Sequence, residues 1–385
     1  MSKLAVLIAL LSFVPGSVGP ASEQAALACP GPKSVPPPRR ALPDDQCPSL
    51  AAVDAALSRS DELGEDELQR LRATVQASLE RSPEGCAGAL GARLANDEVC
   101  GAAYDAVAVR IVTSRAVDEA VIAGELLRPS PCQWKLVASL REVSSVSPSV
   151  WVAIDTLTRS DDDDVRRSAW MTYGTLGRIA REAGETDLAA CGERRLSTAL
   201  ASDRPAGDTR VLLSAAGNAG CSACRASLDV AMAGAVEDRR IAVAADRFLE
   251  DRAAVDRMCR ALRSDRDASV RGAAAFGLRH RSTFGVERLE CLYDASMGDP
   301  ADEVSRDAVA SIEELARQGS EDERTLAVGA LVRIVRHAST SSVREQSLGA
   351  LHGFASDDAI RELDVTGGEG HGTLSSDTVT SGSNR

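Results

Sequence analysis

The fold of this chain is decided by residues 264–278, which read SDRDASVRGAAAFGL. Acidic and hydroxyl residues before Val270 are typical of a helix start, because they cap free amide groups and their negative charge suits that end of the helix dipole. Val270 then begins an apolar stripe that continues through Ala274, Gly277 and Leu278 at helical spacing. The stretch therefore predicts an amphipathic helix with one buried face.

The same helix start returns along the chain. Its occurrences are Val165-Arg166, Val270-Arg271, Val304 with Arg306, and Val343-Arg344. The last three valines are 34 and 39 residues apart, which is the period of two-helix repeats. One such pair cannot bury its own apolar face, so successive pairs must stack on each other.

The Asp-x-x-Val-Arg-x-x-Ala pattern of residues 267–274 resembles HEAT-type helical repeats. No segment with alternating polarity predicts a sheet. We therefore expect an all-α fold, a right-handed α-solenoid of HEAT-like helix pairs over residues 132–363. Residues 49–131 are also helical in pattern but match the repeat poorly, so we expect them to form an N-terminal helical cap.

Both ends of the sequence differ from the repeat region. Residues 1–28 combine a basic start with an apolar run over 4–14, which is typical of a secretory signal peptide and too short to span a membrane. Seven prolines predict an extended linker over residues 29–48. Residues 364–385 are rich in Gly, Ser and Thr, and we expect a disordered tail there.

The expected location is outside the cytoplasm, either periplasmic or secreted. Cleavage after Ala26-Leu27-Ala28 would leave Cys29 as the first residue, so a lipoprotein anchored through Cys29 is an alternative. No later stretch approaches the roughly 20 apolar residues of a spanning helix, so we expect no transmembrane segment. The net charge of −13 argues against a nucleic-acid surface, which needs clustered Lys and Arg.

Ten cysteines in an exported chain predict disulfides first. Our expected pairs are Cys29 with Cys47, which would close the proline-rich loop, and Cys86 with Cys100. Cys221 and Cys224 form the one close pair in the sequence. A structural disulfide is favoured there over a redox role, because no β-α-β context surrounds the pair.

A narrower resemblance covers about residues 132–355. Residues 170–176 (WMTYGTL) and 213–220 (LSAAGNAG) are similar to the helical domain of vitellogenin-type large lipid transfer proteins. That resemblance implies a lipid or lipoprotein-handling role as the alternative function. The chain lacks the β-sheet regions that form the lipid cavity in that family, and Gly217, Asn218 and Gly220 are explained by helix termination alone.

No sequence motif indicates catalysis or metal binding. The four histidines are scattered, the acidic run 161–164 lacks the alternation and glycine of a calcium loop, and no nucleophile or phosphate-loop signature occurs. We expect no enzyme, catalytic residue, cofactor or metal.

Four arginines occupy related positions in the repeats. They are Arg166, Arg210, Arg271 and Arg344. They would either form a ladder on a binding face or pair with acidic residues of their own or the next repeat, and we favour pairing. The sequence predicts an exported, non-enzymatic scaffold that presents a solenoid surface to a protein partner, with lipid as the alternative ligand.

Overall fold

The computed structural model describes residues 47–59, 62–249, 251–280 and 285–354. The expected signal peptide, most of the linker and the tail lie outside these ranges. Within them the regular structure is helical, and no strand occurs. None of these helices combines the length and the apolar character that a membrane span requires.

The chain divides into two compact units, residues Met1–Thr198 and Ala199–Arg385. The helices of the first unit are α2 (Leu50–Leu57), α3 (Glu65–Arg81), α4 (Pro83–Ala95), α5 (Ala102–Thr113), α6 (Glu119–Leu126), α7 (Gln133–Ser139), the 3-10 turn η2 (Leu140–Glu142), α8 (Pro148–Leu157) and α9 (Asp163–Glu182). Helix α10 (Thr186–Ala201) begins in the first unit and ends in the second.

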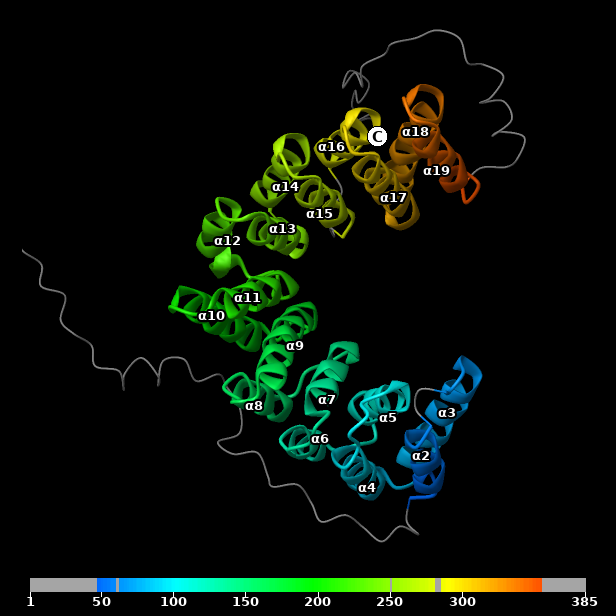
Figure 1. The fold of residues 1–385 in the computed structure, drawn as a ribbon, viewed down its shortest axis with the longest axis vertical. Helices are drawn as coiled ribbons and strands as arrows, with labels where there is room; N and C mark the ends of the chain where they lie inside the picture. The colour runs from blue at the N-terminus through cyan, green and yellow to red at the C-terminus, as the bar shows by residue number, and fades with distance from the viewer. Residues whose placement is uncertain (1–46, 60–61, 250, 281–284, 355–385) are drawn as a thin grey trace, which may run out of the picture. The chain divides into compact units, whose positions relative to one another are not determined.

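Alternate helices of the first unit form two layers (Figure 1). Helices α3, α5, α7 and α9 pack on one another in order, and α4, α6 and α8 do the same in the second layer. The boundary expected at residue 131 lies inside this unit, and the helices on both sides of it follow the same stacking rule.

The second unit repeats this plan. Its elements are α11 (Ala206–Ala219), the 3-10 turn η3 (Ser222–Cys224), α12 (Arg225–Met232), α13 (Val236–Ala245), the 3-10 turn η4 (Asp246–Phe248), α14 (Arg252–Ser264), α15 (Ala268–Arg279), α16 (Val286–Gly298), α17 (Asp302–Gln318), α18 (Glu321–His337) and α19 (Ser341–Leu351). Helices α11, α13, α15, α17 and α19 stack in one layer, and α14, α16 and α18 stack in the other. Layers in which each element packs on its neighbours in the series define an all-α solenoid, as predicted.

Two of the four repeated helix starts are capped by an aspartate as the sequence predicts, whereas Ala301 and Thr340 precede α17 and α19 without a side-chain cap. Asp267 caps α15 by accepting a hydrogen bond from the Ser269 amide at 2.9 Å, and Asp162 caps α9 in the same way. The four stripe-opening valines are all buried, namely Val165, Val270, Val304 and Val343. The acidic run 161–164 is therefore accounted for by helix capping.

Two exposed valines lie outside the buried stripes. Val286 is 52% exposed because it is the first residue of α16, whose buried residues begin at Arg288 and Leu289. Val99 is 57% exposed and precedes α5, which ends at Thr113.

Glycines allow the helices of the second unit to turn and to approach closely. Gly220 ends α11 in the left-handed conformation, with φ of 57°. Gly217 does not turn the chain, although we expected it to. It lies inside α11, where a Cβ atom would come within 2.6 Å of the Cα atom of Ala245. It is therefore a packing residue between α11 and α13.

Candidate functional site

The cysteines of the described residues are all disulfide-bonded. The four pairs with both partners described are Cys47–Cys86, Cys100–Cys132, Cys221–Cys224 and Cys259–Cys291. Cys191 is disulfide-bonded as well. No free thiol occurs in this part of the chain.

The expected pairs Cys29–Cys47 and Cys86–Cys100 are wrong, because Cys47 bonds to Cys86 and Cys100 bonds to Cys132. Cys29 itself lies outside the described residues. The repeat explains the error: Cys100–Cys132 and Cys259–Cys291 each span 32 residues, close to one repeat, so these disulfides join equivalent positions of consecutive helix pairs.

Cys221 and Cys224 are bonded to each other across η3, and both are buried. The disulfide closes the short connection between α11 and α12. This geometry agrees with the structural interpretation of the pair.

Two of the four repeat arginines pair with the next helix pair. Arg271 is buried and forms an ion pair with Asp299. Arg210 donates from Nε to Asp238 at 2.7 Å. Arg271 therefore serves the packing between repeats and is not presented on a binding face.

The other two arginines bond within their own repeat. Arg166 donates to the Ser160 carbonyl at 3.0 Å and pairs with Asp163. Arg344 donates to the Ala338 carbonyl at 2.7 Å. Arg166 thus follows the pairing interpretation, whereas Arg344 departs from it because its contacts are to backbone carbonyls. Any role of Arg166, Arg210 or Arg344 in contacting a partner stays a prediction.

An apolar groove of about 540 Å³ lies beside α12 in the second unit. Its apolar lining comes from the end of α10 and from α11 and α12, through Leu200, Ala206, Leu213, Ala226, Val230 and Ala231. Val230 is 75% exposed. Asp238 lies at the edge, where Arg210 holds its carboxylate.

A second surface feature lies on the exposed side of α15. Phe276 is partly exposed, and its ring centre lies 4.5 Å from that of His280 and 5.4 Å from the Arg279 guanidinium carbon. Burial, together with the charges of Arg279 and Arg247, lowers the pKa of His280. A lowered pKa keeps this imidazole neutral near pH 7.

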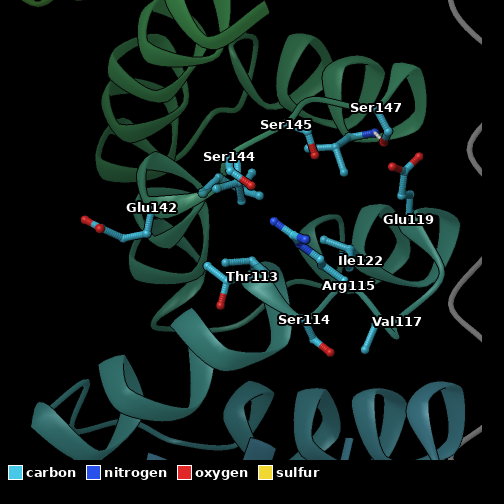
Figure 2. Close-up of a pocket in the computed structure, with 14 residues that line it drawn as sticks. Thr113, Ser114, Arg115, Val117, Glu119, Ile122, Glu142, Ser144, Ser145 and Ser147 are labelled. Atoms are coloured by element: carbon cyan, nitrogen blue, oxygen red, sulfur yellow. Dashed lines mark hydrogen bonds between the residues drawn. The ribbon is translucent and has the colours of Figure 1, made fainter. Parts of the chain in front are cut away.

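A smaller recess of about 230 Å³ lies in the first unit (Figure 2). It is enclosed by the end of α5, the start of α6, η2 and the segment before α8. Arg115 extends into the space between Thr113, Ile122 and Ser144. Glu119 and Glu142 also line the recess.

The described residues contain no group of His, Cys, Asp and Glu side chains that could hold a metal ion. The sequence did not indicate either cavity. Both are lined by residues of several helices, and the periodicity of one helix does not report how far it lies from its neighbours.

Comparisons with known proteins give only distant structural matches. No known family matches the chain, and no curated protein matches its sequence. A designed armadillo repeat protein is similar over 52% of this chain and 98% of its own, with 17% identity and a TM-score of 0.31. Importin beta is similar over 81% of this chain and 54% of its own, with 11% identity and a TM-score of 0.29.

Human deoxyhypusine hydroxylase is similar over 70% of this chain and 98% of its own, with 15% identity and a TM-score of 0.28. At such TM-scores these matches carry no functional argument, and the solenoid is defined by the helix contacts of this chain itself. The resemblance to vitellogenin-type proteins stays a prediction.

Proposed function

We propose that this chain is an exported, non-enzymatic binding scaffold whose groove beside α12 receives aliphatic side chains of a protein partner. The observation that carries the proposal is Val230, which is 75% exposed and lines a groove whose other lining residues are mainly apolar. Covering an exposed aliphatic side chain is favourable by about 1.5–3 kcal/mol.

The surroundings of the groove support a protein partner. The ion pair between Arg210 and Asp238 stands at its edge, with side chains 39% and 30% exposed. Such a pair offers polar contacts around an apolar centre, which is the usual composition of a protein interface. The Cys221–Cys224 disulfide closes the turn that leads into α12. It therefore restricts the motion of this helix and preorganises the groove for binding.

Export is supported by the cysteines. Disulfides persist in oxidising compartments and are rare in the cytosol, and every cysteine in the described part of this chain is bonded. The apolar lining of the groove also favours the alternative, in which a lipid tail occupies it.

Site-specific photo-crosslinking tests the proposal. A benzophenone amino acid at position 230 is expected to capture one defined protein in the fraction where the chain resides. The matched control is the same amino acid at position 326, because Leu326 on α18 is also an exposed aliphatic residue at 43%. Equal capture from both positions, or crosslinks to lipid alone, would contradict the proposal.

A further inference from the structure

The recess in the first unit has an apolar floor and a polar rim. The floor is formed by buried aliphatic side chains, Val112, Val117, Ile122, Leu140 and Val150. The rim carries Arg115, Ser144 and Ser145, all exposed. A recess of about 230 Å³ lies below the range of drug-sized pockets, which is roughly 300–1,000 Å³, and suits a group the size of one amino-acid residue.

The Arg115 guanidinium is free to bind a ligand in this recess. Within the described part of the chain, no ion pair or hydrogen bond engages its guanidinium, whereas nearby Arg128 is held by Glu125 in a two-point ion pair. Figure 2 shows the Arg115 side chain reaching into the middle of the recess. A guanidinium presents its donors in a fork that matches a carboxylate.

A second polar group in the lining also lacks a partner. The Ser114 hydroxyl is buried and makes no hydrogen bond within the described residues. Figure 2 shows this hydroxyl directed away from the Arg115 guanidinium, so it is not a donor to a group bound by Arg115.

The two acidic residues in the lining limit the charge of the ligand. Glu142 points away from Arg115, and Glu119 lies at the opposite end beside Ser147 (Figure 2). One guanidinium matches a single negative charge, whereas a dianion would be repelled by both glutamates. The recess therefore favours a carboxylate over a phosphate.

We propose that this recess binds the C-terminal residue of a partner polypeptide, with its carboxylate on Arg115 and its aliphatic side chain on the Ile122 and Val150 floor. A C-terminal residue combines these two features, whereas an Asp or Glu side chain ends in the carboxylate and has no apolar end. Capture of a terminal carboxylate is a recurring mode of peptide recognition. The inference extends the proposed scaffold function to a second site, and it uses residues of the first unit only.

The test is an NMR titration that follows the methyl group of Ile122 in the full chain. The probes are acetyl-Gly-Ser-Gly-Val with a free carboxylate and the same peptide with a C-terminal amide. The free carboxylate is expected to bind at least about tenfold more tightly. Arg115→Gln is expected to abolish this difference, while Arg167→Gln, an exposed arginine on α9, retains it.

Circular dichroism of both variants checks that the fold is intact. Equal binding of the two peptides, an unchanged preference in Arg115→Gln, or no shift of the Ile122 methyl group with either peptide overturns the proposal. Tighter binding of inorganic phosphate, or of an amidated peptide with an internal Glu, also overturns it. Because the groove beside α12 has no residue in common with the recess, failure here is distinguishable from failure of the crosslinking test at Val230.

Discussion

Arg271 on α15 donates from Nε and Nη2 to the two carboxylate oxygens of Asp299, at 2.7 and 2.8 Å. Asp299 is the C-cap residue of α16, so this ion pair joins one helix pair to the next. Arg239 and Asp265 repeat the arrangement one helix pair earlier, at 2.8 and 3.0 Å. These two arginine–aspartate pairs therefore stabilise the stacking of repeats in the second unit.

Breaking the buried pair is expected to be costly. Arg271→Met keeps the aliphatic stem but leaves the Asp299 carboxylate, whose side chain is 4% exposed, without its counter-charge. Removing one partner of such a pair costs about 3 kcal/mol or more. Urea unfolding at pH 7 measures the loss of free energy of unfolding.

The matched control for Arg271→Met is Arg324→Met, because Arg324 pairs with Glu321 on the exposed face of α18. An exposed pair is worth less than about 1 kcal/mol. Equal losses of free energy of unfolding in the two variants would show that the Arg271–Asp299 pair stabilises the fold no more than an exposed pair.

Ala274→Asp is expected to disrupt the stacking of α15. Ala274 is fully buried in the core that α15 shares with its neighbours. An unpaired buried carboxylate there should lower the free energy of unfolding by more than about 3 kcal/mol. Phe276→Asp places the same group on the exposed side of the same helix, so a thermal midpoint lowered equally by both would refute this assignment of the buried face.

Asp265 makes stability depend on pH. The hydrogen bond from Arg239 holds the pKa of Asp265 below its usual value. A carboxyl whose folded pKa is lowered adds stability above its unfolded pKa, about 3.9, and that stability is lost as the pH falls through the folded pKa. Urea midpoints between pH 6 and pH 2 should therefore fall less steeply for Arg239→Gln than for the unchanged chain, and parallel curves would contradict the prediction.

The disulfides should contribute differently to the free energy of unfolding, because they close loops of different length. Cys259–Cys291 closes a loop with a sequence separation of 32, and loop-closure entropy for that length corresponds to about 4 kcal/mol. Cys221–Cys224 has a separation of 3 and should contribute roughly half as much. Unfolding of the two double Cys→Ser variants compares them, and a larger loss from the short loop would contradict the entropic account.

The sequence predicted the helical class, the repeat and most of the buried stripe, because these depend on local periodicity. Val270 and Ala274 are buried for the reason that the spacing indicates. It also favoured the correct interpretation of Arg271, since an arginine beside a buried stripe needs a counter-charge.

The cavities and most disulfides escaped prediction because they depend on the separation of helices in space. Cys259 and Cys291 are one repeat apart, and this spacing was the signal that would have paired them. Nothing in the periodicity marks Val230 or Arg115. Val230 is exposed where the short helix α12 leaves a groove, and Arg115 lies in a connection between helices.

The most direct measurement is native and then denaturing intact mass spectrometry of the protein recovered from its own exported fraction. The account predicts a chain that lacks residues 1–28, gains mass on reduction of its disulfides, and carries a protein partner in the native spectrum. A chain that retains residues 1–28, or one that carries lipid lost on denaturation and no protein, would contradict it.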